Sequence, residues 1–498
     1  MTADLRAPRV AIIGAGMSGL CMAITLHRAG ITDVTIYEKA DSVGGTWRDN
    51  TYPGLSCDVP SRFYQFTFAA KPDWSHLFSP GGEIGDYFTQ VATDFGLDEC
   101  IRFGTEVVRA EFVDGCWRLH TSHGDTQEVD FLISATGILH HPRYPVLKGM
   151  DDFAGAMFHS ARWDHSVAHV GKRVAVIGTG STGVQIVCGV AGVAGQLELF
   201  QRSAQWILPL PNPTYSTVSG KLHSTVPALS ALSYRGYRAA FEFFAKALVT
   251  PGWRRSLISA ACRANLRTVR DRALRQALTP DYQPMCKRLV ISSRFYRAMQ
   301  RRDVELVAES IDHIEAAGIV TADGRLHELD VIVLATGFDA HAFLRPTTLI
   351  GADGATLDEA WAQGPRAHLT VSLPGFPNFF MLLGPHSPVG NYSLTAIAET
   401  QAEHVLSWIE RWQRAEFDTV APTQQATDAF NAEMRVAMPD TVWTTGCTSW
   451  YLGTDGIPEL WPWTPGLHRD RLREVDLADF ELRLFEPIGG HGAARRER

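Results

Sequence analysis

The sequence predicts an α/β protein with two doubly wound, Rossmann-like dinucleotide-binding domains, one inserted in the other, plus a helical insert. A short apolar run leads into a glycine triplet twice, at 9–19 and at 172–183. Each of these two units later closes on an apolar run that ends in Ala-Thr-Gly, at 131–137 and at 331–337. Such alternation of strand and helix patterns is typical of parallel sheets.

The first glycine triplet consists of Gly14, Gly16 and Gly19, and the apolar run 34–37 that follows it ends at Glu38. A turn of this kind directs backbone N–H groups and a helix N-terminus at a pyrophosphate. A carboxylate at the end of the second strand accepts hydrogen bonds from a free ribose 2′-OH. This unit therefore predicts a site for an unphosphorylated dinucleotide, for which FAD is the natural candidate.

The second triplet, Gly178, Gly180 and Gly183, has a basic residue at the matching position, Arg202. The offset is the same in both units, because 38 − 19 and 202 − 183 both equal 19. An arginine there pairs with a ribose 2′-phosphate, so the second unit predicts an NADPH site. The alternative is a solvated arginine at a strand end. The residues expected to hold this nucleotide are Gly178, Thr179, Gly180, Ser181, Thr182, Gly183, Gln185, Arg202, Ser203 and Lys287.

Length and composition indicate a globular protein of two or three domains: the chain has 498 residues, 45% of them hydrophobic and 20% charged. The net charge of −8 gives no reason to expect nucleic acid. No apolar run reaches the length of a transmembrane helix. We expect a cytoplasmic enzyme with a disordered tail at 489–498, and the sequence leaves its oligomeric state open.

The eight cysteines lack the close spacing of zinc ligands or of a redox-active disulfide, so we predict no metal site. This pattern suits a reducing compartment. We expect all eight to be buried as small side chains.

The predicted domains are discontinuous in the sequence. An FAD-binding domain comprises 1–145 and 375–498, an NADP-binding domain comprises 146–210 and 281–374, and the helical insert occupies 211–280.

The insert is strongly basic. Between Gly220 and Pro280 eleven Lys or Arg residues accompany two acids, a local balance of 11 − 2 = +9. Residues 234–249 and 260–278 have helical periodicity. One interpretation is a helical cap with solvated basic faces; the other is an amphipathic patch that makes weak contact with an anionic membrane surface or an acidic partner.

The segment between the two units carries a family signature. Phe153, Gly155, His159 and Trp163 match the pattern FxGxxxHxxxW, which resembles the fingerprint of Baeyer-Villiger monooxygenases. These FAD- and NADPH-dependent oxygenases are related to flavin-containing monooxygenases, and the terminal Trp163 favours the Baeyer-Villiger branch.

Three further segments resemble signatures of that family. They are 44–58, which ends at Asp58, the Lys287-Arg288 pair after Cys286, and Ser449-Trp450-Tyr451. The resemblance extends from Val10 to about Trp463 and is weakest through the insert.

The resemblance implies that reduced FAD reacts with O2 to give a C4a-peroxide, which attacks a ketone to form an ester or lactone. It implies that Arg288 stabilises the anionic oxygen and that Asp58 holds Arg288 in place. It also implies that NADP+ stays bound while the second domain shifts about hinges at 153–163 and 336–339. From the residues alone, Arg288 could be a surface side chain and Asp58 a turn residue. His159 is expected to be structural.

Several other residues are expected near the cofactors. Trp47 and Tyr64 are expected to line the flavin, with core packing as the alternative. Asn391 is expected to begin a helix aimed at the flavin, with loop packing as the alternative. Aromatic loops at 63–68 and 443–463 suggest a hydrophobic pocket for the ketone. The remaining cofactor-binding candidates are Gly14, Gly16, Gly19, Glu38, Thr46, Asp58, Val107, Arg288 and Trp450.

Three other functions remain open at this point. The first is N- or S-oxygenation of soft nucleophiles, which needs no carbonyl-activating arginine. The second is a plain NADPH:acceptor reductase, for which the expected redox cysteines are missing. The third is an inactive flavin-binding partner protein.

Overall fold

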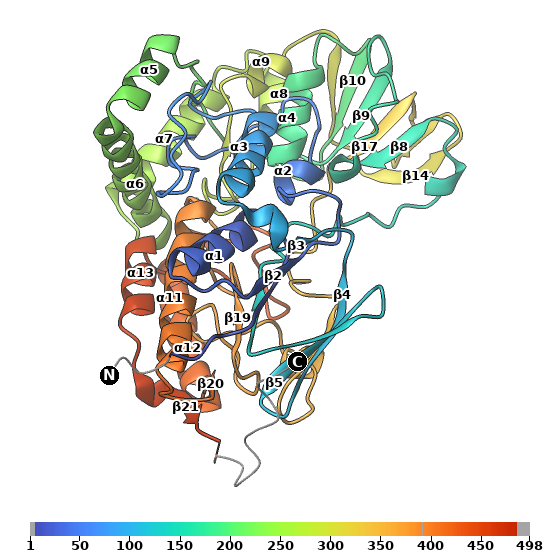
Figure 1. Cartoon of the computed structure of the whole chain (residues 1–498). Helices are drawn as coiled ribbons and strands as arrows, with labels where there is room; N and C mark the ends of the chain where they lie inside the picture. The colour runs from blue at the N-terminus through green and yellow to red at the C-terminus, as the bar shows by residue number, and fades with distance from the viewer. Residues whose placement is uncertain (1–4, 391, 486–498) are drawn as a thin grey trace.

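The computed structural model describes residues 5–390 and 392–485, and two five-stranded parallel sheets organise it (Figure 1). The first sheet has the order β19-β7-β1-β2-β3, so its first strand lies at the centre. The helices α1, α3 and α11 belong to this part of the chain, and α11 packs along α1. The bounds are β1 Val10–Ile13, α1 Met17–Arg28, β2 Val34–Tyr37, α2 Thr46–Asp49, α3 Gly81–Asp94, β3 Ile101–Arg102, β7 Phe131–Ser134, β19 Phe379–Met381 and α11 Leu394–Gln413.

The second sheet repeats this arrangement with the order β13-β10-β9-β17-β8. Its edge strand β8 comes from the segment that carries the FxGxxxHxxxW pattern. The bounds are β8 Ala156–His159, β9 Arg173–Ile177, α4 Ser181–Val190, β10 Gln196–Phe200, α9 Phe295–Ala298, β13 Val304–Val307 and β17 Val331–Leu334. The chain leaves the first sheet after β7 and returns to it with β19, so the second sheet is nested within the first unit. The predicted fold class is confirmed.

One steric contact explains why the first position of each glycine triplet is glycine. Gly14 and Gly178 have positive φ angles of 104° and 120°. A Cβ on Gly14 would lie 2.7 Å from the carbonyl oxygen of Ala135, and a Cβ on Gly178 would lie 2.3 Å from that of Ala335. Only glycine therefore lets the last strand approach each turn.

Smaller sheets flank the two large ones. They include an antiparallel pair formed by residues 107–113 and 116–121. These smaller strands are β4 Val107–Val113, β5 Cys116–Thr121, β6 Thr126–Val129, β11 Ile207–Leu208, β12 Val290–Ile291, β14 Ile311–Glu315, β15 Gly318–Thr321, β16 Leu326–Glu328, β18 Thr348–Ile350, β20 Thr419–Pro422 and β21 Phe480–Arg483.

The basic insert forms the helices α5 Thr217–Thr225, α6 Pro227–Val249, α7 Trp253–Leu266 and α8 Arg272–Ala277. The continuous helical pattern expected over 260–278 is wrong at 267–271, where the chain turns between α7 and α8. The physical reason is the Asp271 carboxylate, which accepts a hydrogen bond from the Leu274 N–H and so caps a new helix.

The remaining helices are α10 Leu357–Ala360, α12 Gln424–Ala437 and α13 Pro465–Arg473. In the described part of the chain, no helix combines the length and the apolar character needed to cross a membrane. The expectations for Asn391 and for the tail lie outside the described residues, and α11 begins at Leu394.

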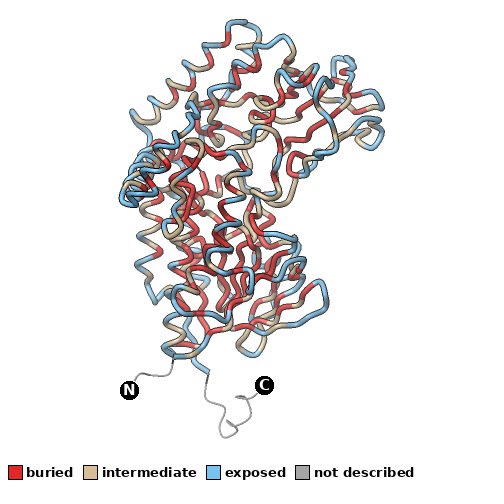
Figure 2. The backbone as a smooth tube through the Cα atoms, turned by 45° about the horizontal axis from the view of Figure 1, so that its top comes forward, coloured by how far each residue is buried: buried red, intermediate tan, exposed pale blue. Residues whose placement is uncertain are grey.

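Buried residues follow the strands of both sheets, whereas exposed residues concentrate on the insert and the outer loops (Figure 2). The aromatic loop at 63–68 contributes to this core, because Phe63 and Phe66 are fully buried. Phe63 packs against Tyr234 of α6 and against Tyr392. Phe66 packs against Tyr87 and Phe88 of α3. The expectation of a substrate pocket is therefore wrong for these two side chains, which belong to the core.

Candidate active site

Arg288 and Asp58 meet although 230 positions separate them in the sequence. The Arg288 Nε and Nη2 groups donate to the two oxygens of Asp58 at 2.9 and 2.8 Å. The Nη1 group donates to the carbonyl oxygen of Val389 at 2.9 Å. The guanidinium is therefore held on two sides, by a loop before α3 and by the loop after β19.

Two N–H groups of Arg288, one on each terminal nitrogen, have no partner among the described residues. The side chains of Arg288 and Asp58 are 25% and 22% exposed, so the pair is only partly open to solvent. Burial lowers the pKa of Arg288, but the ion pair with Asp58 outweighs it and leaves the pKa above its ordinary value. Arg288 is a permanent cation with two donors to offer.

Tyr451 adds a polar group near this pair. Its side chain is almost fully buried, and its hydroxyl has no hydrogen-bond partner in the described residues. Burial raises the pKa of Tyr451, so the hydroxyl stays protonated at neutral pH. The half-buried Trp450 ring packs against Tyr451, with the ring centroids 4.3 Å apart.

The residues expected to bind a 2′-phosphate also gather. The Lys287 Nζ donates to the Ser203 hydroxyl at 2.8 Å and lies over the Tyr282 ring. Burial, and then the nearby charge of Arg202, lower the pKa of Lys287. Arg202 is exposed, and the Thr179 hydroxyl donates to the Ser203 carbonyl at 2.7 Å. These groups form a cationic cluster at the end of β10.

The glycine turns leave the N-termini of α1 and α4 uncapped. Gly16 and Gly180 precede α1 and α4 in extended conformation, and neither helix has a side-chain cap. Nothing lies within 4 Å of the Cβ position on Gly180. The third glycines are packed instead, because a Cβ on Gly19 or Gly183 would lie 1.9 or 2.0 Å from a backbone oxygen of the first glycine. The first-turn N–H groups of both helices are therefore available to an anion.

Glu38 is buried at the end of β2. Its two oxygens accept hydrogen bonds from the Ala15 and Ala40 N–H groups at 2.8 and 2.9 Å, and Arg48 lies 3.2 Å away. Oε1 faces both Ala40 and Arg48, whereas Oε2 accepts only from Ala15 and keeps a second lone pair for a ribose hydroxyl. Thr46 lies close to this turn, since a Cβ on the preceding Gly45 would approach Gly16 to 3.1 Å.

Trp47 and Tyr64 form one hydrogen-bonded pair, in which the Trp47 Nε1 donates to the Tyr64 hydroxyl at 3.1 Å. Tyr64 is buried, and burial raises the pKa of its hydroxyl. Val107 is buried at the start of β4, where its carbonyl accepts a hydrogen bond from Thr347. Contact of these three residues with a flavin stays a prediction.

His159 ties together the two segments expected to act as hinges. Its ring is completely buried; Nε2 lies 3.1 Å from the Gly337 carbonyl oxygen, and Nδ1 accepts a hydrogen bond from the Ala161 N–H. Burial lowers the pKa of His159, so it is neutral at pH 7. Its place at the end of β8 agrees with a structural role.

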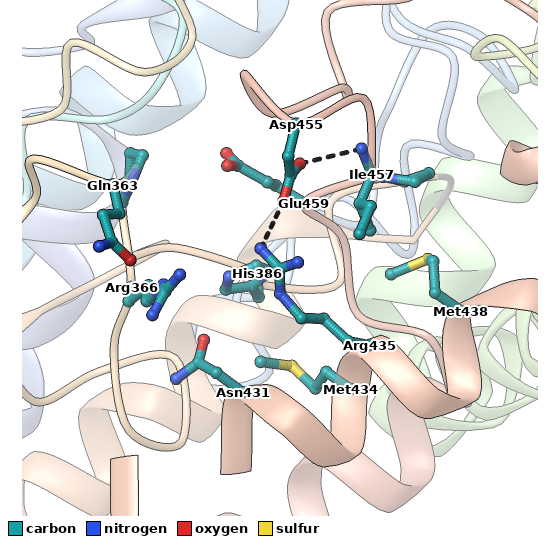
Figure 3. A pocket seen from close by; sticks show the side chains of 12 residues that line it. Gln363, Arg366, His386, Asn431, Met434, Arg435, Met438, Asp455, Ile457 and Glu459 are labelled. Carbon is teal, nitrogen blue, oxygen red and sulfur yellow. Dashed lines mark hydrogen bonds and ion pairs between the residues drawn. The ribbon is translucent and has the colours of Figure 1, made fainter. Parts of the chain in front are cut away.

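A separate pocket lies beside α12 (Figure 3). His386 points into it, and Arg435 forms an ion pair with Asp455 at its edge. Burial lowers the pKa of His386 to about 4, so its ring is neutral at pH 7. None of the predicted catalytic or cofactor-binding residues lines this pocket, but four of its lining residues, Asp455, Ile457, Pro458 and Glu459, belong to the loop at 443–463 that was expected to form a hydrophobic pocket.

Comparison with known proteins agrees with this geometry. Residues 7–215 match the family model described as flavin-binding monooxygenase-like. An uncharacterized monooxygenase of Mycobacterium tuberculosis is 62% identical over 97% of this chain and 98% of its own length. A Baeyer-Villiger monooxygenase of Streptomyces coelicolor is 38% identical over 95% of this chain and 92% of its own length. The chain belongs to the Baeyer-Villiger monooxygenase family.

A solved structure supports the same assignment for this Baeyer-Villiger monooxygenase. OTEMO in complex with FAD and NADP has a TM-score of 0.85 and 30% identity, covering 96% of this chain and 99% of that one. The uncapped glycine turns, the free lone pair of Glu38 and the cluster of Arg202 and Lys287 fit two such nucleotides in this monooxygenase.

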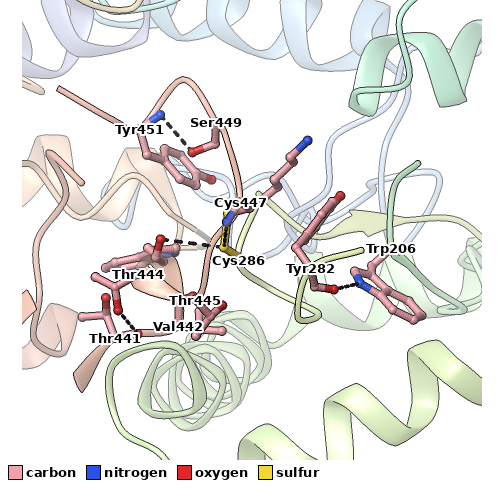
Figure 4. The surroundings of a disulfide bond; sticks show 12 residues. Trp206, Tyr282, Cys286, Thr441, Val442, Thr444, Thr445, Cys447, Ser449 and Tyr451 are labelled. Atoms are coloured by element: carbon pink, nitrogen blue, oxygen red, sulfur yellow. Dashed lines mark hydrogen bonds between the residues drawn. A yellow bond between two sulfur atoms is a disulfide. The ribbon is translucent and has the colours of Figure 1, made fainter. Parts of the chain in front are cut away.

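The cysteine prediction is wrong in two respects. Cys286 and Cys447 form a disulfide, with their Cα atoms 6.0 Å apart (Figure 4). Of the six free cysteines, Cys100, Cys116 and Cys188 are only half-buried. The disulfide joins residues 161 positions apart, so the local spacing of cysteines could not predict it. The one available signal was that both cysteines adjoin family signatures, at Lys287-Arg288 and at Ser449-Trp450-Tyr451.

The sequence also did not predict the contact between the loop at 52–56 and α4. The Tyr52 hydroxyl donates to the Gln185 Oε1 at 3.0 Å, and the Gln185 Nε2 donates to the Ser56 carbonyl at 2.8 Å. Gln185, expected to bind NADPH, therefore links the two nucleotide-binding units in this monooxygenase.

Proposed function

We propose that this Baeyer-Villiger monooxygenase inserts one oxygen atom from O2 beside the carbonyl of a hydrophobic ketone, with Arg288 as the catalytic cation and Asp58 as the residue that positions it. The chain is an NADPH- and FAD-dependent flavoprotein monooxygenase. When bound, the flavin supplies the reaction with O2 and the nicotinamide supplies the hydride.

The two unpartnered N–H groups of Arg288 carry this proposal. Negative charge develops on oxygen when a carbonyl is attacked, and a preorganised cation stabilises that charge most where water is excluded. Because Asp58 uses both of its oxygens on Arg288, it is an orienting partner and not a proton acceptor. The neutral hydroxyl of Tyr451, which has no partner among the described residues, is a candidate for a further donor.

We assign the nucleotides to the two nested units. Residues 1–145 and 375–498 bind FAD, 146–210 and 281–374 bind NADPH, and 211–280 form the insert. The support is that Glu38 ends β2 in the first sheet, whereas Arg202 follows β10 in the second. A cytoplasmic location follows as a proposal from the need for NADPH.

The variant Arg288→Ala tests the catalytic proposal. We expect NADPH to reduce the bound flavin at close to the normal rate, because the residues at the 2′-phosphate site remain. Ester formation from a cyclic ketone should fall by roughly 100-fold or more, the loss typical of an oxyanion-stabilising donor. Stopped-flow absorbance measures the first step and gas chromatography measures the second.

Arg325→Ala is the matched control, because Arg325 forms an exposed ion pair with Glu305 away from the site. It should leave both steps unchanged. If Arg288→Ala still formed the ester at the normal rate, Arg288 would not be the catalytic cation. Oxidation of a thioether with no reaction of any ketone would instead favour the S-oxygenating function.

We infer further that the insert touches an anionic membrane surface. Leu232 on α6 is 65% exposed, and Trp253 and Leu257 on α7 are 62% and 58% exposed. The basic residues Arg235 and Lys246 are exposed on α6 as well. Apolar side chains accompanied by basic ones are typical of surfaces that bind anionic lipid.

Sedimentation with vesicles tests this contact. We expect the enzyme to bind vesicles that contain phosphatidylserine and not vesicles of phosphatidylcholine alone. The double variant Leu232→Ser with Trp253→Ser should lose binding, whereas Val436→Ser, which changes an exposed valine on α12, should keep it. Equal sedimentation of the double variant and the unchanged enzyme would refute the membrane contact.

A further inference from the structure

The disulfide between Cys286 and Cys447 joins the two segments that supply the charged and aromatic groups of the site (Figure 4). Cys286 immediately precedes Lys287 and Arg288. Cys447 lies three and four residues before Trp450 and Tyr451. The bond therefore connects a loop assigned to the NADP-binding domain with one assigned to the FAD-binding domain.

The sulfur atom of Cys286 is the main link between these segments. Among the described residues, the hydrogen bond between 283–289 and 441–451 is the one that the Cys447 N–H donates to the Cys286 sulfur at 3.3 Å. The carbonyl oxygen of Trp443 lies 3.7 Å from the same sulfur, which has no hydrogen to donate in the disulfide. Arg288, by contrast, is held independently by Asp58 and Val389. Opening the disulfide thus releases the segment with Trp450 and Tyr451 more than it releases the cation.

The aromatic side chains of the segment that would be released occupy defined positions. Tyr451 is almost fully buried, with a hydroxyl that finds no partner in the described chain, and Trp450 packs on its ring. Only Thr445 and Gly446 separate Cys447 from the preceding 3-10 turn, Val442–Thr444, and Gly446 has a φ of 97°. The segment folds back on itself, since the Tyr451 carbonyl accepts a hydrogen bond from the Glu459 N–H. The disulfide adds the covalent restraint that ties it to the loop with Arg288.

We propose that Cys286 and Cys447 are a reversible positioning pair: as a disulfide they hold Trp450 and Tyr451 beside Arg288, and as thiols they release them, so that NADPH consumption is no longer coupled to ketone oxygenation. Disulfides in reducing compartments are usually transient or redox-sensing. The effect on coupling rests on the proposed function; the positional effect does not.

The chemistry is thiol–disulfide exchange with a dithiol. A thiolate of the dithiol attacks the Cys447 sulfur, the S–S bond breaks, and Cys286 leaves as a thiolate. The second thiol of the reductant then attacks the mixed disulfide and releases Cys447. The reductant becomes a disulfide, and its two electrons and two protons end on the two cysteines.

Thiol titration is the first test. The purified holoenzyme is unfolded, and its reactive thiols are then counted. Without reductant, six of the eight cysteines should react, and after dithiothreitol all eight should. Peptide mapping should find Cys286 joined to Cys447. Eight reactive thiols in the aerobically purified enzyme would overturn the proposal.

Hydrogen–deuterium exchange provides a readout that does not need activity. Dithiothreitol should raise exchange at 446–456 and leave β9 and β17 unchanged, and Cys447→Ser should reproduce this without reductant. Cys116→Ser, which changes a free cysteine on β5, is the control and should have no effect. Unchanged exchange at 446–456 after reduction would show that the disulfide does not position the segment.

Turnover gives the last readout. In the reduced wild type and in Cys447→Ser, flavin reduction by NADPH should proceed normally, while ester formed per NADPH falls about threefold or more, with hydrogen peroxide making up the difference. If the enzyme oxygenated no ketone in either state, the proposed function would fail while the exchange result would still stand. Normal coupling in the reduced wild type would overturn the proposal, and this arm does not depend on a variant that folds.

Discussion

Arg288 is fixed in place by protein groups alone. Two bonds to Asp58 and one to Val389 restrict its rotamer, so little side-chain entropy remains to be lost when a ligand arrives. Positioning of this kind explains how a flexible arginine side chain serves a reaction that needs charge at one point. Asp58 acts through Arg288. Replacing Asp58 should alter the position of the Arg288 guanidinium more than its positive charge.

Cofactor selectivity is a property of single residues at the 2′-phosphate cluster. Lys287→Ala should lower kcat/KM for NADPH by about 10- to 100-fold, the loss expected for one charge-assisted hydrogen bond, and leave kcat/KM for NADH nearly unchanged. Steady-state kinetics with both nucleotides measures this. Equal losses with both would mean that Lys287 does not contact the 2′-phosphate.

The pH dependence of this cluster follows from burial. Because the pKa of Lys287 lies below its ordinary value, the ammonium loses its proton at a lower pH than a free lysine does. The KM for NADPH should therefore increase as the pH is raised. This increase should begin at a lower pH than any increase in the KM for NADH. Lys287→Arg should flatten that rise, since arginine keeps its charge.

At the scale of the element, the glycines of a strand–turn–helix unit have different structural roles. Gly183 lets α4 approach the turn, because a Cβ there would lie 2.0 Å from the Gly178 carbonyl oxygen, whereas Gly180 faces open space. Packing and ligand approach are therefore separate requirements within one motif.

A pair of alanine variants separates these tasks. Gly183→Ala should lower the thermal midpoint, because overpacking costs about 1–3 kcal/mol. Gly180→Ala should keep the thermal midpoint of the nucleotide-free protein but raise the KM for NADPH, because its methyl group occupies the space left for the pyrophosphate. Thermal unfolding and kinetics distinguish the two; a Gly180→Ala variant with normal KM would place the pyrophosphate elsewhere.

Helix α11 carries a carboxyl group whose protonation changes on folding. Glu399 accepts hydrogen bonds from the Thr67 N–H and hydroxyl, and burial raises its pKa to about 7. A raised pKa in the folded state means that stability is greatest at low pH and falls as the pH rises from about 4.5 through 7.

Glu399→Gln should remove that fall, so its thermal midpoint should exceed that of the wild type at pH 8 and differ little at pH 5. Glu359→Gln is the opposite control, because the bonds to Thr356 lower the pKa of Glu359 and its contribution is present at high pH. Circular dichroism melts at the two pH values measure both. A Glu399→Gln variant less stable than the wild type at pH 8 would contradict the assignment.

At the scale of the whole molecule, the two nested units meet through a contact between backbones. A Cβ on Gly189 of α4 would lie 2.7 Å from the Pro53 carbonyl, and a Cβ on Gly54 would lie 2.4 Å from the Gln185 carbonyl oxygen. Tyr52 and Gln185 add hydrogen bonds across the same surface. This contact and the disulfide are two separate restraints on the relative motion of the units.

Gly189→Ala should disturb this contact. We expect a lower thermal midpoint and less ester per NADPH, because the added methyl group forces the loop at 52–56 away from α4. Gly236→Ala on α6 is the matched control: nothing lies within 4 Å of its Cβ position, so alanine should stabilise the helix slightly. Equal midpoints for the two variants would show that the close approach is not needed.

Local patterns in the sequence determined the glycine turns, the opposite charges of Glu38 and Arg202, and the alternation that predicts two nested sheets, because each depends on neighbouring residues and backbone sterics. Only the tertiary structure decided which distant residues meet: Cys286 with Cys447, Gly189 with Pro53, and Phe63 with the core instead of a pocket. Those contacts depend on how two sheets and an insert pack against one another, and no period or spacing along a chain encodes that packing.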